Sequence, residues 1–434
     1  MLESSYRKRL ARDLPRWREH GWVTADGATA ILASVEDERP GMGLSAVIAT
    51  LGAVLFGVGV IALVAANWEL IPRLLRFGML VGALAAAYAA AAVLHKRDAP
   101  AFAEAAMLIV GLIFAGAIAL IGQSYHLGGE FADAVLLWAV GCLAAALFAR
   151  SSAMTLLALV GSAYWTVLAT SGLDAPPHWG GLALVLVGGA VALHVDSRMA
   201  RASAVLALGF WVAVAITASA LSYQWPAGGA LALAAVAALA LWSVGSALTS
   251  LDSRPRLEAL GRDMLWPSLA ALLLALAVLQ LEPDLPKSTN GRGWLALSGA
   301  ALAAAAAAAG FAGRRNRLGR TDVLAVLVIG VGSIAFALWP PPDGFAARLL
   351  GSGLVLLGAL WAVSLGQSGR QPAGKVTGLV VFGAEVIYVY VVTFGTMLNT
   401  ALALLGGGLL FILLAILLVR IDRHLAARAT GGAA

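Results

Sequence analysis

Apolar runs of about twenty residues follow one another along this chain after a hydrophilic start of about forty residues. Short polar segments separate the runs, and a helix of about 20 residues crosses the hydrocarbon core of a bilayer. The pattern therefore predicts an all-α, polytopic membrane protein with about fourteen transmembrane helices. The predicted spans are 43–66, 73–94, 100–121, 131–149, 152–170, 179–195, 201–221, 226–248, 263–282, 291–312, 321–339, 346–366, 374–394 and 398–419.

The first forty residues predict a small cytosolic helical hairpin. One helical face carries Tyr6, Leu10, Leu14 and Trp17, and basic residues surround that face. Gly21 is a natural helix stop, and Thr24 can cap a second helix. We expect Pro15 to kink or restart the first helix. The simplest role is a basic anchor on the anionic inner leaflet, and the alternative is a docking site for a cytosolic partner protein.

Composition supports the membrane assignment and excludes several other classes. Charged residues make up 12% of the chain, about half the share in soluble domains. The net charge of +6 lies in short clusters between apolar runs, which is typical of a membrane topology signal and not of nucleic-acid binding. Cys142 is the single cysteine, which excludes an intramolecular disulfide and a multi-cysteine metal site. Residues 1–40 contain no apolar signal segment, so the first span is expected to direct insertion.

The distribution of Lys and Arg predicts the orientation. If the N-terminus is cytosolic, 24 of the 29 basic residues lie in inner segments. The positive-inside rule then predicts that both termini lie in the cytoplasm. The five exceptions lie in outer segments, and they are Arg73, Arg76, Lys287, Arg292 and Arg348.

Two of these exceptions point to a candidate site at the outer face. Arg73 and Arg76 are three residues apart and share one helix face, and Glu69 lies just before them. The next outer loop adds a histidine, a tyrosine and acidic residues. If the first four membrane helices pack together, these residues form one outer polar cluster that suits an anionic lipid or another phosphate-bearing ligand. The alternative is a belt of interfacial side chains. The outer polar cluster comprises Asn67, Trp68, Glu69, Arg73, Arg76, Gln123, Tyr125, His126, Glu130 and Asp133.

Several short motifs within the first 150 residues resemble an uncharacterised family of bacterial integral membrane proteins, domain of unknown function 2157 (DUF2157). They are GWVT at 21–24, AANW at 65–68, GQSYHLGG at 122–129 and LLW at 136–138. The resemblance implies a multi-pass inner-membrane protein and implies no activity. It suggests three parts: the hairpin at 1–40, a family-like four-helix membrane unit at 41–150, and a further membrane region of about ten helices at 151–434.

A second candidate site is Glu385, which lies eleven residues into the thirteenth predicted span. No predicted span carries Lys or Arg at that depth, so this carboxyl group is expected to favour its neutral form. Ionisable residues inside a membrane often belong to proton relays. The alternative is a neutral acid that forms a hydrogen bond with Tyr388 or with a neighbouring Ser or Thr. Glu104, near the inner end of the third span, is expected to be structural.

These features favour a transporter or flippase-like carrier. One alternative is a membrane-embedded enzyme that acts on a lipid-linked substrate at the outer face, with His126 and Glu130 or Asp133 as acid and base. The other is a scaffold or sensor that recruits a partner through the hairpin. No catalytic motif is present, so the catalytic residues stay unknown. The sequence predicts no cofactor and no metal site, and the expected partner is the lipid bilayer.

Overall fold

The computed structural model describes residues 5–34, 72–125, 128–170, 175–281, 292–341 and 343–394, with isolated positions at 48–66 and 408–412. These residues are helical, with no strand among them. The helices have the following bounds: α1 Ser5–Glu19, α2 Ala25–Ser34, α4 Arg73–Lys96, α5 Pro100–Tyr125, α6 Phe131–Ala149, α7 Ser152–Ala169, α8 Trp179–Val195, α9 Arg198–Ser222, α10 Ala227–Leu248, α11 Pro255–Leu279, α12 Gly293–Arg314, α13 Arg320–Leu338, α14 Gly344–Gln367 and α15 Pro372–Phe394.

Eleven of the described helices are long and apolar enough to cross a membrane, and α8 is a shorter apolar helix. These twelve helices coincide with the second to thirteenth predicted spans. The structure describes only parts of the first predicted span (48, 51–52, 54–59, 62 and 66) and of the fourteenth (408–409 and 412), so the total of fourteen stays a prediction. The chain divides into two compact units, Met1–Ser162 (unit 1) and Ala163–Ala434 (unit 2), with the boundary inside α7.

Unit 1 begins with the predicted helical hairpin. Leu10 and Leu14 of α1 pack against Ala28 of α2 in a small apolar core. Gly21 has a positive φ of 74° and ends α1, and the Trp22 N–H donates to the carbonyl of Trp17, as in a Schellman motif. Thr24 caps α2 by accepting a hydrogen bond from the Gly27 N–H at 3.1 Å. α1 continues through Pro15, so the expected restart of the helix at this residue is wrong.

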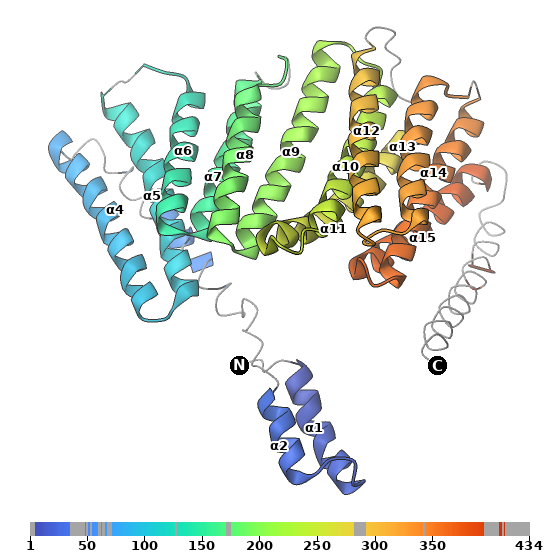
Figure 1. Cartoon of the computed structure of the whole chain (residues 1–434). Helices are drawn as coiled ribbons and strands as arrows, with labels where there is room; N and C mark the ends of the chain where they lie inside the picture. Colours follow the sequence, from blue (N-terminus) through green and yellow to red (C-terminus); the bar gives the residue numbers. More distant parts are fainter. Residues whose placement is uncertain are drawn as a thin grey trace. The chain divides into compact units, whose positions relative to one another are not determined.

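The remaining helices of unit 1 follow one another as antiparallel neighbours, with α4 packed on α5 and α5 on α6 (Figure 1). Glu104 of α5 connects this helix to the start of α7 through hydrogen bonds. Its carboxylate accepts hydrogen bonds from the Ser151 hydroxyl at 2.8 Å and from the Ala153 N–H at 2.7 Å. A carboxylate at a helix N-terminus satisfies backbone donors that have no partner within the helix. Glu104 therefore has a structural role.

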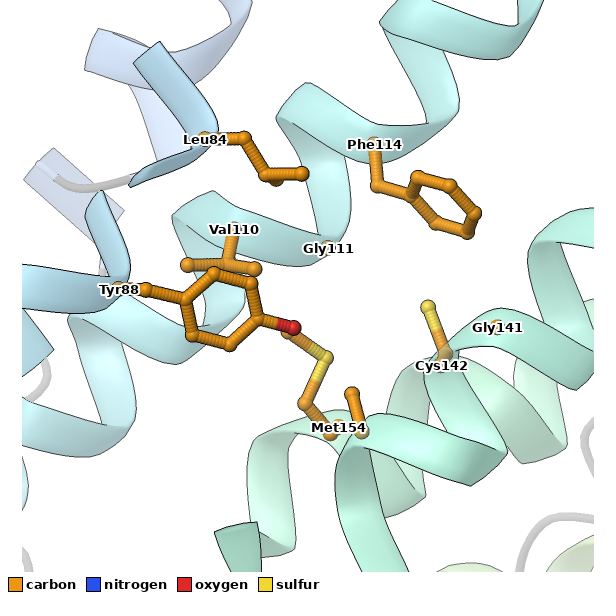
Figure 2. Close-up of a pocket in the computed structure, with 9 residues that line it drawn as sticks. Leu84, Tyr88, Val110, Gly111, Phe114, Gly141, Cys142 and Met154 are labelled. Carbon is orange, nitrogen blue, oxygen red and sulfur yellow. The ribbon is translucent and has the colours of Figure 1, made fainter. Parts of the chain in front are cut away.

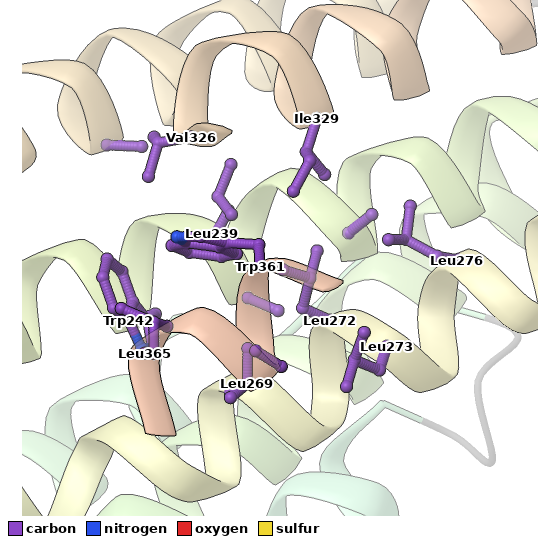
Figure 3. Close-up of a cluster of buried hydrophobic side chains, with 14 of the residues drawn as sticks. Leu239, Trp242, Leu269, Leu272, Leu273, Leu276, Val326, Ile329, Trp361 and Leu365 are labelled. Atoms are coloured by element: carbon purple, nitrogen blue, oxygen red, sulfur yellow. The ribbon is translucent and has the colours of Figure 1, made fainter. Parts of the chain in front are cut away.

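Unit 2 is built around α10, which packs against α9, α11, α12 and α13. Figure 3 shows the core, where Leu239 and Trp242 of α10 meet leucines of α11, Ile329 of α13 and Trp361 of α14. Glycines allow the backbones of α10 and α11 to approach closely. A Cβ at Gly261 of α11 would lie 2.5 Å from the Gly245 carbonyl oxygen of α10. Small residues at membrane helix contacts permit this approach where lipid supplies no hydrophobic driving force.

Candidate functional site

The outer polar cluster is only partly within the described residues. Asn67, Trp68, Glu69 and His126 lie outside them, as do the side chains of Arg73 and Tyr125. Because α4, α5 and α6 alternate in direction, the start of α4, the end of α5 and the start of α6 lie at one end of unit 1. The structure thus brings the Arg76, Gln123, Glu130 and Asp133 segments to the same end.

Asp133 has a local structural partner at this end. Its Oδ2 accepts a hydrogen bond from the backbone N–H of Glu130 at 3.2 Å, and both residues lie at the N-terminus of α6. An acidic side chain in the first turn also complements the helix dipole. Capping therefore accounts for the position of Asp133 without a ligand, and one functional site at this end stays a prediction.

A small cavity of about 180 Å³ lies deeper in unit 1, between α4, α5, α6 and α7 (Figure 2). Tyr88, Phe114, Cys142 and Met154 contribute side chains to it. Cys142 is a buried free thiol. The lining is mostly apolar and sulfur-containing, and the described residues hold no group of three or more His, Cys, Asp or Glu side chains that could bind a metal ion.

Glu385 is buried at an intersection of three helices of unit 2. It belongs to α15, and its side chain joins a chain of polar groups through Gln280 and Ser352. The Gln280 amide donates to Glu385 Oε2 at 3.2 Å, and the Ser352 hydroxyl donates to Gln280 Oε1 at 2.9 Å. Gln280 caps the C-terminus of α11, and Ser352 lies in α14. We call these three residues the Glu385 triad.

One carboxyl oxygen of Glu385 is unsatisfied. Glu385 Oε1 is buried and has no hydrogen-bond partner among the residues that the structure describes. The other oxygen, Oε2, accepts its hydrogen bond from the neutral amide of Gln280, which supplies no positive charge. Buried polar groups without partners are uncommon and destabilising, and they frequently mark functional positions. Glu385 Oε1 is therefore available to carry a proton or to accept a hydrogen bond from a small ligand.

Sequence reasoning missed Gln280 and Ser352. Gln280 ends an apolar helix just before a polar loop, so in the sequence it is indistinguishable from an ordinary cap residue. The close contact between α11 and α14 depends on Gly351, because a Cβ there would lie 2.5 Å from Gln280 Cβ. In the sequence, the contact between Gln280 and Ser352 is indicated only by a polar residue at the end of one span and a Gly-Ser pair in another. Such a pattern is common and does not identify the contact.

A second buried acid in unit 2, Asp322, has a different environment. Its carboxylate accepts hydrogen bonds from Arg370 at 3.0 Å, from the Trp361 indole at 3.3 Å and from the Gly319 N–H at 2.8 Å. Trp361 also packs edge-on against Trp242, whose indole donates to Gln371 at 3.1 Å. These contacts fasten the start of α13 to α14 and to the connection between α14 and α15.

Unit 2 also contains a larger cavity, of about 510 Å³, which we call the aromatic cavity. It lies between α8, α9, α10 and α12 at the ends where α8, α10 and α12 begin. Its lining includes Trp179, Trp211, Ile216, Tyr223, Leu233 and Leu297. Ligand sites in proteins occupy about 300–1,000 Å³, so the volume is adequate for a small-molecule or lipid-chain ligand.

Comparison with known proteins identifies one part of the chain. Residues 15–155 match the family model described as predicted membrane protein (DUF2157). The chain contains a DUF2157 domain. This match confirms the resemblance inferred from the motifs in the first 150 residues. No curated protein and no solved structure matches the chain.

The DUF2157 domain and the long apolar helices establish an integral, multi-pass membrane protein embedded in a lipid bilayer. The domain contains the outer polar cluster and the small cavity of unit 1. The Glu385 triad and the aromatic cavity lie beyond it, in the part of the chain for which no relative supplies a function.

Proposed function

We propose that the protein is a transporter or flippase-like carrier in which Glu385 binds and releases a proton. The observation that carries this proposal is the unsatisfied, buried Oε1 of Glu385 within a membrane-spanning helix. Intramembrane carboxyl groups are expensive to maintain and are characteristic of proton relays in pumps and transporters. The triad joins α11, α14 and α15, so a change in the proton occupancy of Glu385 acts directly on three helices.

Movement of protons by the full-length protein in liposomes tests this function. The liposomes contain an internal pH indicator, and a panel of amphipathic and anionic solutes is added outside. We expect a solute that causes proton movement with the wild-type protein to cause none with Glu385→Gln. Glu104→Gln is the matched control, because Glu104 is a hydrogen-bonded acid with a structural role in unit 1. Solute-driven proton movement that persists in Glu385→Gln would contradict the proposal.

We further propose an inner-membrane location in a bacterium, with both termini in the cytoplasm. The support is the distribution of basic residues, because 24 of the 29 lie in inner segments if the N-terminus is cytosolic. In a Cys142→Ser background, single cysteines at 128, 174, 288 and 396 should react with a membrane-impermeant reagent added to intact cells. Cysteines at 98, 252 and 318 should stay unreactive, and labelling at 318 would reverse the orientation.

The proposal also includes two binding functions, one at the outer polar cluster and one at the N-terminal hairpin. The outer polar cluster would hold an anionic lipid or another phosphate group, supported by the common end at which its described segments lie. The hairpin would lie on the anionic inner leaflet as a basic anchor or, in the alternative, dock a cytosolic protein, and Trp22, whose surface is 72% exposed, is available for either contact. The enzyme alternative has less support, because the Asp133 carboxylate accepts a hydrogen bond from the Glu130 N–H at the N-terminus of α6 and capping already accounts for its position.

A further inference from the structure

The aromatic cavity exists because two neighbouring helices differ in length. α8 has 17 residues and α9 has 25, so their lengths are about 25 Å and about 37 Å. They are joined by a short turn at their other ends, and Pro176 and Pro177 precede α8. The last turns of α9 therefore extend beyond the start of α8. The side chains of α9 at this level face a space that a longer α8 would have filled.

The chemistry of this space favours a hydrocarbon occupant. Its walls are mostly aromatic and aliphatic side chains, with Ser219 as the one small hydroxyl side chain among the described lining residues. Trp211 and Trp225 are buried, while Trp179 and Tyr223 are exposed. Water gains few hydrogen bonds in an apolar cavity, and such cavities stay dry unless an apolar ligand enters. The helices are surrounded by lipid, so an acyl chain is the hydrocarbon that is available at high concentration.

A basic residue is adjacent in the chain to a glycine that lies against one wall of the cavity. Arg292 is exposed and precedes α12 as its N-cap residue. The neighbouring Gly293 lies against Trp225, since a Cβ on this glycine would be 3.5 Å from the Trp225 ring. Arg292 is also one of the five basic residues in predicted outer segments. A guanidinium near the mouth of an apolar cavity complements a lipid phosphate attached to an acyl chain.

We propose that the aromatic cavity binds one anionic glycerophospholipid, with an acyl chain between α9 and α12 and its phosphate at Arg292. This site goes beyond the carrier function, because binding does not require proton movement by Glu385. Tyr223 and Trp179 lie where the chain leaves the cavity, as aromatic side chains do at the interface of a membrane.

The test is lipid retention by the full-length protein, measured by native mass spectrometry after purification with added dioleoyl phosphatidylglycerol. Ala215 of α9 lines the cavity, and Ala213, two residues away on the same helix, is exposed. Ala215→Phe should reduce retention of the lipid at least about tenfold because the ring occupies the space of the chain. Ala213→Phe adds the same ring outside the cavity and should retain the lipid as the wild type does.

Arg292→Gln tests the contact with the lipid headgroup separately from the binding of the acyl chain. This variant should lose the preference for phosphatidylglycerol over phosphatidylcholine and keep measurable binding of both lipids. Glu385→Gln should bind as the wild type does, so failure of the carrier function leaves this test intact. A folded Ala215→Phe protein that retains phosphatidylglycerol as well as Ala213→Phe does would overturn the proposal. Equal retention of the two lipids by the wild type would overturn the role of Arg292.

Discussion

Asp322 and Glu385 are both buried in unit 2, with 3% and 4% of their surfaces exposed, yet their partners differ. Asp322 accepts hydrogen bonds from a guanidinium, an indole and a backbone N–H. Within the described part of the chain, Glu385 receives a hydrogen bond from the Gln280 amide at Oε2, and its Oε1 has no partner. Burial alone therefore does not identify a functional acid. A structural acid is distinguished from a candidate functional acid by its hydrogen-bond partners. Donors such as those around Asp322 hold the carboxylate in its charged form, whereas Glu385 lacks such a set of donors among the described residues.

The largest expected effect on stability is that of replacing Asp322, the acid whose carboxylate accepts several hydrogen bonds. Asp322→Ala removes the partner of Arg370 and leaves the Trp361 indole and the Gly319 N–H without an acceptor. Breaking such a buried network should lower the free energy of unfolding by about 2–4 kcal/mol. Thermal unfolding of the purified protein in detergent measures this loss. An effect no larger than that of Glu385→Gln would remove the distinction between the two acids.

A smaller effect is expected from the residue that connects the Glu385 triad. Gln280→Leu removes the donor to Glu385 and the acceptor of the Ser352 hydroxyl, both in a buried environment. The expected loss of stability is about 1–3 kcal/mol, measured in the same unfolding experiment. The double variant Gln280→Leu with Glu385→Leu should recover part of this loss because it removes the unsatisfied carboxyl group as well. A double variant that is less stable by the full sum of the single effects would show that the two side chains are independent.

The smallest effect concerns the outer polar cluster, where the described acid already caps a helix. If the cluster is one site, Arg76→Ala and Asp133→Ala should be non-additive by more than about 0.5 kcal/mol. If Asp133 acts only as a cap, the two effects should add. Arg73→Ala with Glu130→Ala provides the second pair. Additivity in both pairs, together with a silent His126→Ala, would reduce the cluster to an interfacial belt.

Much of the fold was predictable because lipid imposes a strong and simple pattern. Continuous apolar runs gave the positions of twelve described helices, and Gly21 and Thr24 gave the turn of the hairpin. The resemblance to DUF2157 was also confirmed. Pro15 does not restart the helix, because α1 continues through it to Glu19, and the alternative of a kink stays a prediction.

The sites were less predictable, since they depend on contacts between distant segments. Glu385 was recognisable as a lone acid in an apolar run, but its contact with Gln280 is set by the packing of α11, α14 and α15. The aromatic cavity depends on a difference in helix length that becomes meaningful only when α8 and α9 are neighbours. Periodicity identifies the face of a helix and does not identify the helix that it meets.

The most direct measurement of the central claim is an infrared titration of the wild-type protein against Glu385→Gln in lipid. Gln preserves the shape of the neutral acid and cannot titrate, so the difference between the two spectra isolates the Glu385 carboxyl group. The account predicts a carboxylic-acid carbonyl band that is present in the wild type, absent in Glu385→Gln and reduced as the pH rises, with both proteins equally stable within about 1 kcal/mol. A band of constant intensity over the pH range in which the protein stays folded would contradict it, because Glu385 would then be a permanently neutral structural group.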